Sequence, residues 1–181
     1  MKVPYQESVE SQSKMEMTCN LQHFNFGCRA LYASKRCGNF MPNTPIINPS
    51  TNTLLFGKVP EISKRGVKLP GGAIHLLRGK HTGPNRGFGA CHIWAEHSRE
   101  MMAEGFENEA AVPAYVAFVI TAASQLYYSG ESFRYSRLMA VRGIAWTAIL
   151  ELRDRDEPFW SVITAYRSNK KHGTFVGSVL L

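Results

Sequence analysis

The densest group of side chains that could carry out acid–base chemistry lies in residues 61–100 of the 181-residue chain. This window holds seven Lys and Arg residues against three Glu residues, together with four of the six histidines. Histidine is the side chain whose ordinary pKa lies nearest to neutral pH, so it can both accept and donate protons there. Five of the basic groups fall within the segment HLLRGKHTGPNR, namely His75, Arg78, Lys80, His81 and Arg86.

This basic segment contains the groups that metal-free cleavage of RNA requires. The reaction needs a base for the ribose 2'-hydroxyl, cationic or hydrogen-bonding groups for the charge on the phosphorane, and an acid for the leaving 5'-oxygen. The alternative interpretation is a solvated basic loop whose glycines serve only turns. His75, in the AIHLL run, is more typical of a packed strand residue than of a catalyst.

Several familiar catalytic motifs are absent from the sequence. GPNRGFGA lacks the Gly-Lys-Ser/Thr of a Walker loop and the third glycine of a dinucleotide fingerprint, and no GxSxG occurs. His92 and His97 are five residues apart, which is about 500° around a helix, so they do not share a face as a helical pair of zinc ligands must. Metal-dependent hydrolysis and serine-nucleophile chemistry lose support, and we expect no metal or other cofactor.

The composition is that of one ordinary globular domain with a basic surface. The chain is 44% hydrophobic and 19% charged, which excludes wholesale disorder and a pure coiled coil. Its 21 basic and 14 acidic residues give 21 − 14 = +7, a surplus that favours a polyanionic partner, nucleic acid first and anionic membrane second. No apolar run reaches the roughly 20 residues of a membrane helix, and no h-region of a secretory signal is visible. We therefore expect a soluble protein without a signal peptide.

The first 65 residues are expected to form an irregular N-terminal appendage and a Pro/Asn-rich linker. Four prolines interrupt every possible helix or central strand there: Pro42, Pro45, Pro49 and Pro60. Three cysteines and one histidine give the spacing C-x3-H-x4-C-x8-C: Cys19, His23, Cys28 and Cys37. Because this spacing matches no standard zinc motif, we favour free thiols over a zinc site or a disulfide.

Residues 66–181 are expected to form an α+β domain in which two helices pack on a four-stranded antiparallel sheet. The helices are expected at about 93–104 and 112–127, the second from an apolar stripe at helical spacing. The strands are expected in 133–141, 144–152, 159–166 and 174–181. Alternation along FWSVITAY places Trp160 and Val162 on the same face as Thr164 and Tyr166.

The order of these segments resembles the barnase/EndoU/colicin/RelE superfamily of small RNase toxins, with the phage-associated and polymorphic-toxin branches closest. The resemblance rests on RGKHTGPNR before the helices and WSVITAY near the end, and it covers residues 66–181. It implies an active site on the sheet face opposite the helices.

Carried onto this chain, the resemblance implies His81 as the proton-transfer base, with Lys80 and Arg78 holding the phosphate. Thr164 would donate a hydrogen bond to a phosphate oxygen, and Tyr166 would stack on a base or assist proton transfer. The acid is His97, with His92 and His172 as alternatives. Further substrate-binding positions are Arg86, Asn85, Arg167 and His172.

The leading hypothesis is a metal-independent endoribonuclease toxin that cuts RNA, with tRNA as the expected substrate, and leaves a 2',3'-cyclic phosphate. Such a toxin acts in the cytoplasm of a target or producer cell after delivery by a dedicated route or a phage, and an acidic immunity or antitoxin protein would cover its basic cleft. The alternatives are a non-catalytic nucleic-acid-binding module and a zinc-bound structural protein organised by the N-terminal cysteines. The density of histidines favours the enzyme, because pure phosphate binders rely on Lys and Arg.

Overall fold

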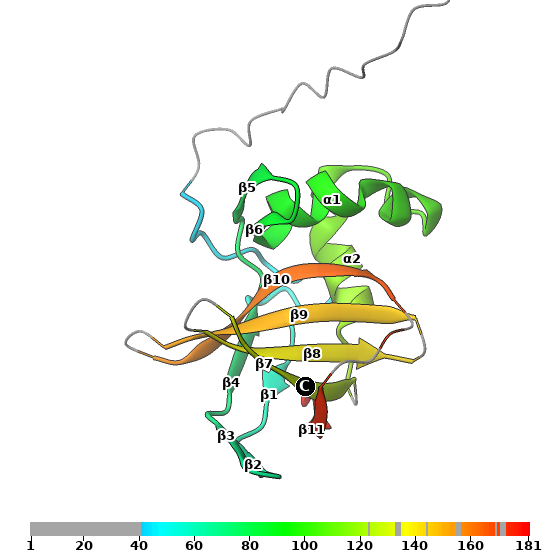
Figure 1. The fold of residues 1–181 in the computed structure, drawn as a ribbon. Coiled ribbons are helices and arrows are strands. Elements are labelled where there is room, and N and C mark those ends of the chain that lie inside the picture. The colour runs from blue at the N-terminus through cyan, green and yellow to red at the C-terminus, as the bar shows by residue number, and fades with distance from the viewer. Residues whose placement is uncertain are drawn as a thin grey trace, which may run out of the picture. The chain divides into compact units, whose positions relative to one another are not determined.

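A computed structural model gives the fold of residues 41–181 (Figure 1), apart from residues 123, 133–134, 144, 155–156, 169 and 171–172. All of the described residues belong to one compact unit, Arg36–Leu181. Within them, no helix is long and apolar enough to cross a membrane. Several positions singled out from the sequence lie outside the described residues: Cys19, His23, Cys28, Cys37 and His172.

The main element of the fold is a seven-stranded mixed sheet in the order β1-β4-β10-β9-β8-β7-β11. The strands are β1 (Lys58–Val59), β4 (Gly72–His75), β7 (Gln125–Ser132), β8 (Tyr135–Arg142), β9 (Trp146–Arg153), β10 (Phe159–Arg167) and β11 (Thr174–Ser178). All neighbouring pairs are antiparallel except β4 and β10, which are parallel. Lys58 and Leu180 exchange two backbone hydrogen bonds of 2.7 and 2.9 Å, so the two edges of the sheet meet in a nearly closed, barrel-like form.

The expected fold of two helices on a four-stranded antiparallel sheet is therefore wrong. The four expected strands correspond to β8, β9, β10 and β11, and the sheet also contains β4, which overlaps the AIHLL run, and the unexpected β1 and β7. A two-residue strand such as β1, among prolines and glycines, carries too little periodicity to be recognised. The expected second helix, 112–127, runs into the start of β7, because Tyr127 continues the helical spacing of the segment before it.

The second helix stops where a polar turn begins. α2 (Val112–Val119) buries Val112, Tyr115, Val116 and Val119 completely, as the apolar stripe predicts, and Pro113 occupies its first turn. Ile120 then adopts an extended conformation, and the Ser124 hydroxyl accepts a hydrogen bond from the Thr121 amide at 3.1 Å. This local bond turns the chain out of the helix and into β7.

The first helix and two hairpins complete the described part of the chain. α1 (Gly89–Ala103) runs beside β10 (Figure 1) and is linked to α2 through the single 3-10 turn η1 (Glu109–Ala111). The hairpins pair β2 (Ile62–Lys64) with β3 (Val67–Leu69) and β5 (Lys80–Gly83) with β6 (Arg86–Phe88). Cys91 lies in the first turn of α1 and is disulfide-bonded.

A bulge at Ile163 decides which residues of β10 face the hydrophobic core. Val162 pairs with Leu150 and Thr164 pairs with Ile149, which leaves Ile163 without a partner on β9. Directly paired residues share a face, and Leu150 alternates with Ile149, so Val162 and Thr164 lie on opposite faces.

The bulge therefore changes which residues of β10 share a face, compared with simple alternation. Trp160, Val162 and Ala165 belong to the core cluster together with residues of α2. Thr164 and Tyr166 share the other face with Ser161. The expectation that Thr164 and Tyr166 share one face holds, but placing Trp160 and Val162 beside them is wrong.

Part of the segment expected as an appendage lies in the core. Phe56, Val59 and Ile62 are 1%, 2% and 3% exposed, and β1 pairs with β4 inside the main sheet. The prolines of this segment lie beside short extended stretches that make contacts with the rest of the unit. They do not mark a linker without such contacts. The compact unit thus includes residues on the N-terminal side of position 65.

We predict that the compact unit, residues 36–181, folds on its own, whereas a chain that begins at Gly66 loses most of its stability. Burial of each large apolar side chain contributes about 1.5–3 kcal/mol, and the loss of Phe56, Val59 and Ile62 approaches the typical total stability of about 5–15 kcal/mol. Circular dichroism and thermal unfolding of the two chains test this. Equal unfolding temperatures would contradict it.

Candidate active site

The β5–β6 hairpin is held against the start of α1 by backbone contacts. The first helix has no side-chain cap, and its early N–H groups instead donate to the carbonyls that precede β5: Ala90 to Leu77 and Cys91 to Arg78, each at 3.0 Å. Gly87 permits the close approach. Its φ is 154°, and a Cβ there would lie 2.2 Å from the Lys80 carbonyl oxygen and 2.9 Å from His92 Nδ1.

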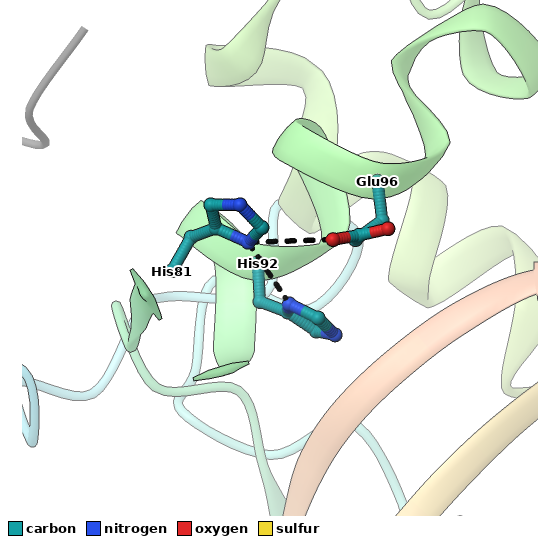
Figure 2. A group of neighbouring side chains, drawn as sticks. All are labelled: His81, His92 and Glu96. Carbon is teal, nitrogen blue, oxygen red and sulfur yellow. Dashed lines mark hydrogen bonds and ion pairs between the residues drawn. The ribbon is translucent and has the colours of Figure 1, made fainter. Parts of the chain in front are cut away.

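This approach brings His81 of β5 onto two residues of α1, His92 and Glu96 (Figure 2). His81 Nδ1 lies 3.3 Å from His92 Nδ1 and 3.6 Å from Glu96 Oε1. His92 is only 5% exposed, whereas the side chains of His81 and Glu96 are 27% and 22% exposed. The Asn85 amide, in the turn of the hairpin, donates a hydrogen bond of 3.1 Å to Glu96 Oε1 and fixes this carboxylate.

We name these three residues, His81, His92 and Glu96, the imidazole–carboxylate cluster. Of these three residues, the sequence predicts only His81 as a central member of the site. His92 and Glu96 are four residues apart on a helix and so share a face. This spacing is visible in the sequence, but His92 was compared only with His97, which lies on another face. The contact between His81 and His92 spans two elements and has no signature in the spacing.

Burial lowers the pKa of His92 from its ordinary value of 6.5. The nearby Glu96 carboxylate acts in the opposite direction, while the charges of His81 and His97 lower the pKa further. His92 is therefore a neutral imidazole at pH 7. A neutral imidazole has one accepting nitrogen, so His92 Nδ1 can accept the hydrogen bond that His81 Nδ1–H donates.

A second group of polar side chains, formed by His97, Glu100, Tyr166 and Arg167, lies further along α1. The rings of His97 and Tyr166 stack with centroids 5.3 Å apart, and His97 Nδ1 lies 3.6 Å from Glu100 Oε1. The Arg167 amide donates to Glu100 Oε2 at 2.9 Å, which ties β10 to the helix. Burial, followed by the charge of Glu100, raises the pKa of Tyr166, so this residue remains a neutral phenol and suits stacking better than proton transfer.

The stacking of Tyr166 on His97 corrects one expectation about the site. We expected the face of Thr164 and Tyr166 to be free of helices. α2 does pack on the opposite face, through the core cluster, but α1 covers Tyr166.

Three hydroxyl groups on the Tyr166 face of the sheet are buried, and none of them has a hydrogen-bond partner within the described residues. They are Ser161 Oγ, Thr164 Oγ1 and Thr147 Oγ1. Register places all three on this face, because Thr147 pairs with Tyr166 and Ser161 pairs with Glu151. Buried polar groups nearly always have partners, so hydroxyls without them are candidates for contacts with a ligand.

The other expected site residues are dispersed around the imidazole–carboxylate cluster. Lys80 and Arg86 are exposed on the two strands of the hairpin that carries His81. Arg78 instead lines a pocket with Ile46 and Glu109 that includes none of the histidines. Arg167 contacts Glu104 with its guanidinium at 3.4 Å, and Asn85 acts on Glu96 through its backbone.

Comparison with protein-family models, with curated proteins and with solved structures finds no match to this chain. The resemblance to the RNase toxin superfamily therefore stays a prediction from the residues.

We predict that Gly87→Ala disrupts the imidazole–carboxylate cluster. The added methyl group would collide with the Lys80 carbonyl and with the His92 ring, and the backbone angle itself is strained for alanine. We expect a loss of about 2–4 kcal/mol in the free energy of unfolding. Gly83→Ala is the matched control, because Gly83 has a similar φ of 143° but nothing within 4 Å of the added methyl group. Equal effects of the two substitutions in chemical denaturation would contradict the close-packing argument.

We also predict that His92 makes stability depend on pH. Because its pKa in the folded state lies below 6.5, the folded state binds fewer protons than the unfolded state, so this contribution is complete above pH 6.5 and is lost as the pH falls. His92→Gln should therefore flatten the decline of the unfolding temperature between about pH 7.5 and about pH 5.5. Parallel curves for the wild type and the variant would show that His92 is not buried in its neutral form.

Proposed function

We propose that the chain is a metal-independent endoribonuclease that activates a ribose 2'-hydroxyl for attack on the adjacent phosphate and leaves a 2',3'-cyclic phosphate. The observation that carries the proposal is the imidazole–carboxylate cluster, in which one partly exposed histidine is held by a buried histidine and a carboxylate. A second histidine–carboxylate pair on the same helix supplies a separate proton donor. The basic charge of the chain suits an RNA substrate.

His81 is the general base of the proposed reaction. Its contacts with His92 and Glu96 both use Nδ1, which leaves Nε2 for the substrate. A proton on Nδ1, donated toward His92 and Glu96, fixes the tautomer in which Nε2 carries a free lone pair. Glu96 also stabilises the imidazolium that forms when Nε2 takes the proton of the 2'-hydroxyl.

His97 is the general acid for the leaving 5'-oxygen. Glu100 Oε1 lies 3.6 Å from its Nδ1 and orients the ring, while Tyr166 holds the ring by stacking. Lys80, exposed on the same hairpin as His81, is the expected cation for the RNA phosphates. Each histidine thus has a carboxylate that orients it for its own half of the reaction.

The proposal extends to the expected setting of such an enzyme. With tRNA as its substrate, the nuclease would act as a toxin in the cytoplasm of a target or producer cell, reached by a dedicated route or through a phage. An acidic immunity or antitoxin protein that covers the exposed Lys80 and Arg86 would hold it inactive, because opposite potentials steer such partners together.

We predict that the purified full chain cleaves total RNA or tRNA in excess EDTA and leaves 2',3'-cyclic phosphate ends. His81→Ala should lower the cleavage rate by about 100- to 10,000-fold, as expected for the loss of a proton-transfer group, without a change in the circular dichroism spectrum. His75→Gln is the control, since His75 contacts the Leu54 carbonyl and the Phe159 ring rather than the cluster. Cleavage ends can be read by enzymatic opening of the cyclic phosphate and end labelling.

Two results would overturn this assignment. RNA binding without cleavage would leave the non-catalytic nucleic-acid-binding module as the better description. Cleavage that persists in His81→Ala but disappears in His97→Ala or His92→Ala would move the base to another histidine.

A further inference from the structure

Two separations between ligand atoms of the imidazole–carboxylate cluster match those between the ligands of a tetrahedral metal site. Zinc binds imidazole nitrogen and carboxylate oxygen at about 2.0–2.2 Å, so two of its ligands lie about 3.3–3.5 Å apart. The observed separations are 3.3 Å between the two imidazole nitrogens and 3.6 Å between His81 Nδ1 and Glu96 Oε1. All three ligand atoms lie within 4.8 Å of one another.

The three side chains are also preorganised in the absence of a bound ion. His92 and Glu96 project from consecutive turns of α1 (Figure 2). His92 is enclosed against Gly87, and the Asn85 amide fixes Glu96 Oε1. Hydrogen bonds of this kind orient the ligands of metal sites and strengthen binding. His81 comes from a hairpin whose backbone contacts α1, so the third ligand is positioned as well.

We propose that His81 Nδ1, His92 Nδ1 and Glu96 Oε1 bind a zinc-type divalent cation, with the fourth position open to water. Two nitrogens and one carboxylate oxygen suit Zn²⁺ and its neighbours in the first transition series. Mg²⁺ is a poor fit, because it prefers six oxygen ligands in an octahedral arrangement. The sequence hides this site, because His81 lies on a different element from the helical pair.

Metal binding would inhibit the proposed nuclease, and this part of the inference rests on the proposed function. A neutral imidazole that binds a metal through Nδ1 carries its proton on Nε2. The lone pair that His81 needs for the 2'-hydroxyl is then absent, and Glu96 is occupied by the ion. His81 Nδ1 therefore either carries the proton of the catalytic tautomer or binds the metal, but not both.

Calorimetric titration of the full chain with ZnCl2, in the absence of RNA, tests the binding directly. We expect the wild type to bind one more equivalent than His81→Gln, His92→Gln and Glu96→Gln. Because loss of an outer-shell partner already costs about 10- to 100-fold in affinity, loss of a ligand should cost at least about 100-fold. His75→Gln is the matched control for the loss of an imidazole and should bind as the wild type does. Every variant retains the N-terminal cysteines, so any zinc that they bind contributes equally.

Co²⁺ absorption identifies the ligands of the bound ion. Co²⁺ bound to two imidazoles and a carboxylate gives visible d–d bands, and we expect these bands to disappear in Glu96→Gln and His81→Gln. No thiolate charge-transfer band should disappear together with them. Unchanged titrations in all three variants, or a spectrum that depends only on the cysteines, would overturn the proposal.

The inhibition is measured separately from the binding. If the chain cleaves RNA, stoichiometric Zn²⁺ should abolish cleavage and EDTA should restore it, whereas Mg²⁺ should not inhibit. Zinc binding with undiminished cleavage would overturn the inhibitory role. If the chain does not cleave RNA, the titrations still decide whether the metal site exists, so failure of the nuclease proposal is distinguishable from failure of this one.

Discussion

The contact between the β5–β6 hairpin and the first turns of α1 is the constraint on which the imidazole–carboxylate cluster depends. The carbonyls of Leu77 and Arg78 take the place of a side-chain cap for the helix. The same contact sets the distance between His81 and His92, so the cap and the cluster are two results of one backbone arrangement. A helix start that uses carbonyls rather than a Ser or Asp cap cannot shift along its axis without separating His92 from His81.

The second constraint on the site is the single extra residue in β10. Ile163 has no partner on β9, and this puts Thr164 and Tyr166 on the face away from the core while Trp160 and Val162 stay within it. A regular strand would have placed a buried indole beside the polar residues. The bulge thus lets one nine-residue strand supply both core packing and polar groups that approach α1.

The sequence predicted the parts of the fold that have strong periodicity and missed those defined by distant contacts. The helical spacing of Val112, Val116 and Val119 marked α2, and alternation marked β8 to β10. By contrast, β1 has two residues and β4 has four, and only pairing across the sheet makes them strands. For the site, the four-residue spacing of His92 and Glu96 was readable, whereas the approach of His81 depends on a tertiary contact, and the face of Thr164 depends on a bulge that composition does not reveal.

The bridge between Lys58 and Leu180 also has a consequence for synthesis of the protein. These residues are 180 − 58 = 122 positions apart, yet their backbones exchange two hydrogen bonds. Contacts between such distant positions form slowly, because a long loop must close first. The sheet cannot close on the ribosome until Leu180 has left the exit tunnel, so the nascent chain carries an open sheet edge until that point.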